Sequence, residues 1–136
     1  MLFTKASEYA LMAVVAIAKS QGPRDVLSLS NDLKLSRSFL AKVLQTLAKA
    51  GILVSYKGAG GGFELSRPAN EVAVVELVRA VDGNSATVFA CSAAVCNCPS
   101  GESKSALCSI WPFLNRLQGK IDDVLAQTTI EDLIHD

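Results

Sequence analysis

Residues 28–65 read SLSNDLKLSRSFLAKVLQTLAKAGILVSYKGAGGGFEL, and the spacing of apolar residues and glycines in this segment predicts two helices and a hairpin. Residues 28–33 are expected to form a short capped helix, and Lys34-Leu35 a turn. Ser36 is expected to cap a second helix, which ends at Gly51 because glycine readily adopts a left-handed conformation. Four apolar residues of that helix recur at the spacing of one helical face: Leu40, Val43, Leu44 and Leu47. The pattern predicts a helix-turn-helix.

A glycine-rich hairpin is expected directly after these two helices. Residues 53–56 and 63–65 are short strand-like runs, and Lys57-Gly58-Ala59-Gly60-Gly61-Gly62 lies between them. Glycine allows the hairpin backbone to approach another backbone closely, and a lysine at its base can meet a phosphate. A helix-turn-helix followed by such a hairpin is typical of a winged DNA-binding module.

The second helix is expected to read the DNA, because a recognition helix lies in the major groove and leads with its N-terminal residues. Arginine and lysine suit phosphates or guanine edges, and glutamine can read adenine. We therefore expect DNA contacts from Ser36, Arg37, Ser38, Lys42, Gln45, Lys57, Gly58, Gly60 and Gly61. The alternatives are an ordinary solvated helix face, or a winged domain that serves protein contacts.

The charge of the chain is divided between its two halves. The 136 residues hold 13 Lys and Arg and 13 Asp and Glu, so the whole chain is neutral. Residues 1–67 hold nine basic against four acidic residues, a net charge of +5, and residues 68–136 hold four against nine, a net charge of −5. A basic half beside an acidic half is expected of a DNA-binding regulator rather than of a non-specific coating protein.

Helical periodicity continues on both sides of this module. Residues 4–20 and 73–81 are expected to be helices, and Thr129 is expected to cap a last short helix over residues 130–134. A longer stripe consists of Ile110, Phe113, Leu114, Leu117, Ile121, Val124 and Leu125. The chain is therefore expected to be mainly α with a small β wing. Residues 1–84 would form the winged helix-turn-helix domain, 85–108 a cysteine-rich loop, and 109–136 a dimerisation helix with a C-terminal cap helix.

The long apolar stripe could pack on its own domain or pair with a second copy of the chain. Pairing is favoured, because a helix-turn-helix gains specificity by presenting two recognition helices to two half-sites. Leu117, Ile121 and Val124 are expected at the seam between the copies. The expected partners are double-stranded DNA, as a pseudo-palindromic operator, and a second copy in a homodimer.

No membrane partner and no catalysis are expected. The apolar run over residues 10–18 is too short to cross a bilayer. The region before it pairs Lys5 with Glu8, and so lacks the positive charge that precedes a signal-peptide core. No nucleophile–base pair or phosphate-binding strand-loop-helix is present. We expect a cytoplasmic protein that is not an enzyme.

All four cysteines, Cys91, Cys96, Cys98 and Cys108, fall within 18 residues. In a reducing compartment such a group indicates a metal or redox site rather than a structural disulfide. The spacings x4, x1 and x9 fit the paired knuckles of a zinc site poorly. A thiol switch needs only two cysteines. An iron–sulfur cluster, which accepts thiolates from an irregular loop, suits the segment best.

Residues 36–40, 57–63 and 80–82, together with a cysteine loop before a long helix, resemble the IscR/NsrR family of bacterial transcription regulators. The similarity runs from Met1 to about Ile134. The resemblance implies a homodimeric winged-helix repressor or activator. In the sensing members, three loop cysteines and a fourth, non-cysteine ligand hold an iron–sulfur cluster. A metal-free thiol and disulfide switch is the alternative way to control operator binding.

Carried onto this chain, the resemblance implies Cys91 and Cys108 as the first and third cluster ligands. The loop is longer than in the family and holds an extra cysteine, so the second ligand is Cys98 or Cys96. Cys98 is preferred because Pro99 follows it. Whether the cluster is 2Fe–2S or 4Fe–4S stays open, as does its signal, which could be redox state, nitric oxide or iron–sulfur status.

The residue implied as the fourth cluster ligand differs from that of one branch of the family. Its iron–sulfur-assembly regulators carry a histidine three residues after the third cysteine, where Trp111 stands here. Glu8 matches the first-helix position at which nitric-oxide and redox sensors place an acidic ligand donated by the other subunit. The alternative for Glu8 is a first-turn carboxylate stabilised by the helix dipole. Ala41 replaces a glutamate that the assembly regulators use to discriminate among operators, so their operators are not assumed for this chain.

Overall fold

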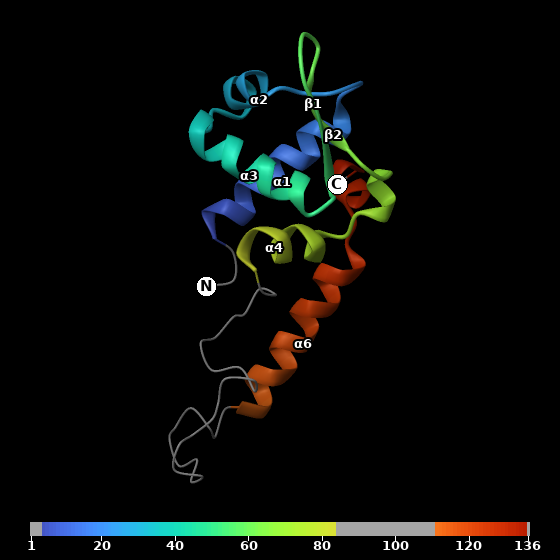
Figure 1. Ribbon diagram of the computed structural model, residues 1–136. Helices are drawn as coiled ribbons and strands as arrows, with labels where there is room; N and C mark the ends of the chain where they lie inside the picture. Colours follow the sequence, from blue (N-terminus) through green and yellow to red (C-terminus); the bar gives the residue numbers. More distant parts are fainter. Residues whose placement is uncertain (1–3, 84–110, 136) are drawn as a thin grey trace.

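The computed structural model describes residues 4–83 and 111–135 (Figure 1). The elements in order are α1 (Lys5–Lys19), α2 (Val26–Leu33), α3 (Arg37–Lys49), β1 (Leu53–Tyr56), β2 (Gly62–Leu65), a 3-10 turn η1 (Ala69–Glu71), α4 (Val74–Asp82), α6 (Trp111–Gln127) and α7 (Ile130–His135). This is the mainly helical fold with a small two-stranded wing that the sequence predicts.

Helix α1 is the scaffold of the fold. Thr4 caps it, since the Thr4 hydroxyl oxygen accepts a hydrogen bond from the Ser7 N–H at 3.2 Å. Its buried apolar residues, Ala10, Ala13, Val14 and Ile17, belong to one core with leucines of α2 and α3. Helix α1 contacts α2, α3, α4, α7 and β2. Helix α3 and the wing are therefore both held by α1.

The helix-turn-helix is confirmed, with two local corrections. Helix α2 begins at Val26 rather than at Ser28. Lys34 ends it in a left-handed conformation, with φ 56°. Ser36 occupies the N-cap position of α3, but its hydroxyl accepts no backbone hydrogen bond and lies instead 3.3 Å from the Ser38 hydroxyl. The four apolar residues expected to face inward from α3 are all buried: Leu40, Val43, Leu44 and Leu47.

The wing is an antiparallel hairpin in which Leu53 lies opposite Leu65 and Tyr56 opposite Gly62. Phe63 also exchanges two backbone hydrogen bonds with Arg24, at 2.9 and 2.7 Å. Gly62 has φ 148°, and a Cβ atom there would overlap the carbonyl group of Arg24. The close backbone approach expected of this glycine run is therefore made to the segment that precedes α2.

The last helix completes the same core as the wing and α1. Thr129 and Asp132 form a capping box, with N–H···O distances of 2.9 and 3.3 Å, which starts α7. The backbone N–H of Val74 donates to the Thr128 carbonyl and that of Ile130 to the Val72 carbonyl, each at 2.9 Å. These bonds place the fully buried Ile130 in the main core.

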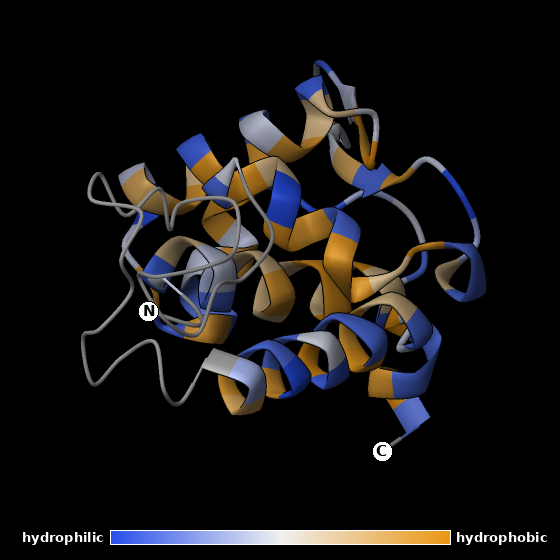
Figure 2. Ribbon diagram, turned by 90° about the horizontal axis from the view of Figure 1, so that it is seen from below, coloured by the Kyte–Doolittle hydropathy of each residue, from blue (hydrophilic) through white to orange (hydrophobic). Residues whose placement is uncertain are grey.

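Helix α6 extends away from the wing end of the molecule (Figure 1), and polar and apolar residues alternate along it (Figure 2). One side of its apolar stripe packs on α4. Leu125 is buried there against Val74, Val75 and Val78, and Ile121 contacts the same cluster. Ile121, expected at a seam between two copies, thus contributes to the core of its own chain. The sequence could not separate these roles, because Ile121 lies on the same helical stripe as the outward residues.

The other side of the α6 stripe is open. Phe113 is 55 % exposed and Val124 62 % exposed. Leu117 lies between them and is half-buried. These three residues share one helical face, since they are spaced by four and seven residues. We call Phe113, Leu117 and Val124 the outer face of α6.

Candidate nucleic-acid interface

The face of α3 opposite the core is exposed from the first turn onward. Ser36, Arg37, Ser38, Lys42 and Gln45 are all exposed. Helical periodicity produces this arrangement, because the leucines at the intervening positions are drawn into the core. The N-terminal turn of α3 therefore offers two hydroxyl groups and a guanidinium group to solvent, where a recognition helix would meet base edges.

The tip of the wing is a tight turn in which three positions, Gly58, Gly60 and Gly61, favour glycine. Gly58 and Gly60 have left-handed φ values of 90° and 77°. The Gly61 N–H donates to the Gly58 carbonyl at 3.0 Å. A Cβ atom on Gly61 would lie 2.5 Å from the Tyr56 carbonyl oxygen. Lys57 is exposed at the base of this turn. The tip of the wing therefore presents backbone groups and one ammonium group to solvent.

Five cations of α3, the turn before it and the wing lack an ion-pair partner among the described residues. Lys34, Arg37, Lys42, Lys49 and Lys57 are all exposed. The ion pairs within residues 4–83 and 111–135 are Lys5–Glu8, Arg24–Asp32 and Arg67–Glu76, so none of the five cations has an acidic partner in this part of the chain. Such a surface can bind a polyanion, with phosphate contacts fixing the register of the protein on the duplex.

Arg24, which no sequence pattern singled out, ties together the end of α1, α2 and the wing. Its guanidinium donates to the Ser20 hydroxyl at 2.9 Å and to the Ser28 hydroxyl at 2.8 and 3.2 Å. It also pairs with Asp32 of α2. With its backbone bonded to Phe63, Arg24 joins the end of α1, α2 and the wing. The sequence signal is weak, because Arg24 precedes α2 and its partners come from several elements.

The start of α1 abuts the start of α3. The ring of Tyr9 meets the ring of Phe39 edge to face, with centroids 5.1 Å apart and planes at 90°. Phe39 directly follows Ser38 in the exposed first turn of α3. Glu8 directly precedes Tyr9, is exposed, and pairs with Lys5 at 3.2 Å. The contact between Tyr9 and Phe39 therefore connects the residue next to Glu8 with the surface of α3 that would meet DNA.

The expected cysteine ligands, Cys91, Cys96, Cys98 and Cys108, lie outside the described residues. Among residues 4–83 and 111–135, no group of three His, Cys, Asp or Glu side chains could hold a metal ion. Of the proposed cluster ligands, Glu8 alone is described. In the same part of the chain, no helix is long and apolar enough to cross a membrane.

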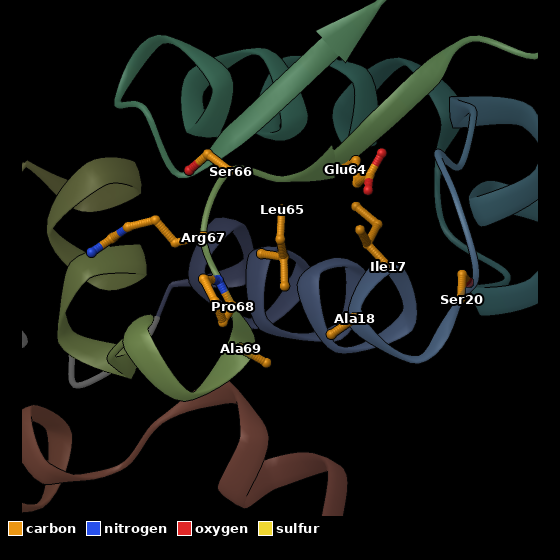
Figure 3. Close-up of a pocket in the computed structure, with 9 residues that line it drawn as sticks. All are labelled: Ile17, Ala18, Ser20, Glu64, Leu65, Ser66, Arg67, Pro68 and Ala69. Carbon is orange, nitrogen blue, oxygen red and sulfur yellow. The ribbon is translucent and has the colours of Figure 1, made fainter.

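A pocket of about 400 Å³ lies between α1 and the segment after β2 (Figure 3). Its only cation, Arg67, hydrogen-bonds Glu76 at 2.7 Å and the Glu71 carbonyl at 3.2 Å. Burial raises the pKa of Glu76, but the hydrogen bond from the Ala73 N–H and the Arg67 guanidinium outweigh it and hold this pKa below its usual value. None of the residues expected to contact DNA lines the pocket, so it is separate from the interface.

Comparison with known proteins identifies the family. Residues 3–136 match the Rrf2 family, described as an iron-dependent transcriptional regulator. The HTH-type transcriptional regulator IscR of Pectobacterium carotovorum is 30% identical over 137 residues, which cover 99% of this chain and 80% of that protein. The expected resemblance to the IscR/NsrR regulators is therefore confirmed.

Solved structures agree with this assignment. CymR, the global cysteine regulator of B. subtilis, has a TM-score of 0.80 at 21% identity, covering 99% of this chain and 97% of that one, and shows a shared fold. The oxidised form of Staphylococcus aureus CymR has a TM-score of 0.74 at 26% identity, covering 100% and 98%. The matched proteins are regulators rather than enzymes, as expected. This chain belongs to the Rrf2 family of transcriptional regulators.

Proposed function

We propose that this regulator binds a pseudo-palindromic operator as a homodimer, and that an iron–sulfur cluster controls the binding. Cys91, Cys98 and Cys108 of one copy and Glu8 of the other would hold the cluster, with Cys96 as the alternative second thiolate. The observation that carries this proposal is the group of four cysteines within 18 residues, in a chain whose family is described as iron-dependent. The signal would be redox state, nitric oxide or iron–sulfur status.

The exposed side chains of α3 and the wing support the DNA-binding part of the proposal. Arg37 and Lys42 suit phosphates or guanine edges, Ser38 suits either, and Gln45 can read adenine. Lys57 and the backbone of Gly58, Gly60 and Gly61 would approach the sugar–phosphate backbone. These cations have no ion-pair partner within residues 4–83 and 111–135, so none of the ion pairs in that part of the chain must break on binding.

The outer face of α6 supports the homodimer. Exposed large apolar side chains that cluster on one face mark an interaction site. A second copy would cover Phe113, Leu117 and Val124 with the same three residues, since a two-fold interface uses one patch twice. Ile121 and Leu125 would remain in the core of each copy and hold α6 on α4.

The donor set suits the cluster. Thiolates hold iron–sulfur clusters, and an exposed carboxylate is an acceptable further ligand for iron. The present partner of Glu8 is Lys5, and both side chains are largely exposed, at 51 % and 79 %. Such a pair contributes about 1 kcal/mol or less, so Glu8 can exchange it for another ligand at little cost. When bound, the cluster would supply one-electron redox chemistry and reactivity toward oxidants.

Ligation of the cluster by Glu8 would affect the DNA-binding face of α3 through α1. Tyr9 follows Glu8 and touches Phe39, which lies beside Ser38. Coupling of this kind requires an element with two arrangements, and α1, which carries Glu8 and contacts α3, would be that element. Loss of the tie at Glu8 would then change the population of DNA-competent dimers.

A metal-free thiol switch is the second candidate. The oxidised form of Staphylococcus aureus CymR, at 26% identity, favours it. Two of the four thiols would then form a disulfide and give up two electrons and two protons to an oxidant.

Anaerobic purification followed by absorption spectroscopy and iron and sulfide analysis tests the proposal. We expect a coloured protein, no chromophore in Cys91→Ala or Cys108→Ala, and a retained chromophore in Cys96→Ala. Glu8→Ala should assemble a cluster that oxygen destroys faster, while Glu131→Ala, which removes an exposed carboxylate from α7, should not. A colourless protein whose operator affinity changes on thiol oxidation would support the thiol switch instead. If Cys96 and Cys98 are both essential and Glu8→Ala is silent, the ligands are all cysteine.

A further inference from the structure

The start of α1 is held by a carboxylate at the far end of α4. Among residues 4–83 and 111–135, Ser7 is the only buried polar residue, at 1 % exposure. Its hydroxyl donates to Asp82 Oδ2 at 2.5 Å, and the Thr4 hydroxyl donates to Asp82 Oδ1 at 2.5 Å. Both oxygens of one carboxylate are thus engaged by residues that are distant in sequence. We call Thr4, Ser7 and Asp82 the α1–α4 clamp.

The negative charge of Asp82 is stabilised by the N-terminus of α1 and not by its own helix, α4. Asp82 is the last residue of α4, and a negative charge is unfavourable at a helix C-terminus. The same charge is favourable at the N-terminus of α1, where the Thr4 oxygen also accepts a hydrogen bond from the Ser7 N–H. Hydrogen bonds to an ionised group are about twice as strong as neutral ones. The clamp therefore fixes the first turn of α1 relative to α4.

The first turn of α1 leads directly to Tyr9, whose ring packs on Phe39 at the start of α3. We infer that Asp82 is a positioning residue for DNA binding, because the clamp sets the place of Tyr9 and hence the angle of the reading helix. The inference rests on the proposed docking of α3 on DNA. Helix α4 precedes the cysteines in the chain. Asp82 would be the residue through which α4 acts on the position of α3.

Comparing the losses of specific and of non-specific DNA affinity distinguishes a positioning role of the clamp from a purely structural one. Base contacts require the correct angle of α3, whereas binding to a random duplex is mainly electrostatic and independent of sequence. A misplaced reading helix should therefore lose specific binding and keep non-specific binding. A chain that is merely less stable, measured well below its unfolding temperature, should lose neither.

The test compares Asp82→Ala and the double variant Thr4→Val/Ser7→Ala with the control Glu76→Gln. Glu76 lies at the other end of α4 and pairs with Arg67, so its loss perturbs α4 without touching the clamp. The probes are an operator selected from random duplexes with the parent chain, and one random duplex. We expect operator affinity to fall about tenfold in both clamp variants, with random-duplex affinity within about twofold of the parent. Asp82→Asn, which keeps one acceptor oxygen, should recover part of the loss.

Equal losses on both duplexes, or a selective loss as large in Glu76→Gln, would overturn the inference. If Asp82→Ala does not fold, Asp82→Asn and the single variant Ser7→Ala decide by the same comparison.

Amide hydrogen exchange separates this inference from the proposed function. If the parent prefers no operator, the proposed docking fails, and the amide of Leu40, bonded to the Ser36 carbonyl at 2.9 Å, still reports on the start of α3. Its exchange should be faster in the clamp variants than in Glu76→Gln. Unchanged exchange would overturn the positioning role on its own.

Discussion

Replacing Gly62 by alanine should detach the wing from the segment before α2. The backbone of Gly62 has φ 148°, and the new Cβ atom would overlap the carbonyl group of Arg24 and crowd the Asp25 nitrogen. These are backbone atoms, so no side chain can rotate away. Relief requires β2 to move from residue 24, which breaks the two hydrogen bonds between Arg24 and Phe63.

The magnitude follows from these terms. Two backbone hydrogen bonds are worth about 1 kcal/mol each, and the unfavourable φ costs about 1–2 kcal/mol for alanine. The free energy of unfolding should therefore fall by about 3–4 kcal/mol. For a chain of this length, that loss lowers the midpoint of thermal unfolding by roughly 10–16 °C.

Urea and thermal unfolding followed by circular dichroism measure this loss. Gly60→Ala is the matched control, since Gly60 also has a left-handed φ, of 77°, but nothing lies within 4 Å of its added Cβ atom. The control should lose only the strain, about 1 kcal/mol. Equal losses in the two variants would refute the close contact between the wing and Arg24 as the reason for a glycine at residue 62.

Three further outcomes are expected. Lys57→Ala should weaken binding to every duplex and reduce the slope of log K against log salt by about one, measured by fluorescence anisotropy; an unchanged slope would argue against a phosphate contact. Val124→Glu, on the outer face of α6, should yield monomers in sedimentation, whereas Ile121→Glu should also lower stability; a parent that is monomeric at micromolar concentration contradicts the dimer. Because the folded pKa of Glu76 is lowered, the stability it contributes is present above about pH 4.3 and is lost as the pH falls through the folded value. Acid titration of unfolding should therefore be flatter in Glu76→Gln, and parallel acid limbs would refute this.

Local patterns predicted the helix-turn-helix and the wing well. The buried face of α3 follows from the spacing of Leu40, Val43, Leu44 and Leu47, which is a property of one helix. The turns at Gly51 and within the wing follow from the conformational freedom of glycine. Thr129 and Asp132 form the capping box that starts α7, again within four residues of one another.

Interactions between distant residues could not be predicted in this way. Asp82 stood out in the sequence only through a family resemblance, and its hydroxyl partners lie 75 and 78 residues away. Arg24 gathers partners from α1, α2 and the wing. The two sides of the α6 stripe differ only because α4 covers one of them, which no periodicity reveals. The candidate cluster site stays a prediction, because its cysteines lie outside the described residues.

Because Ile130 lies in the core, the core cannot be completed until α7 has been synthesised. The ribosome releases α1, α2, α3 and the wing first, yet the core that holds them is completed by Ile130, which is synthesised later. Until Ile130 and the hydrogen bonds that join Thr128 to Val74 and Ile130 to Val72 are available, the nascent helix-turn-helix and wing expose the apolar surface that α7 will cover. A chain that stops after α6 would therefore keep α3 and the wing but leave the core open, and a chain with an open core is a target for proteases.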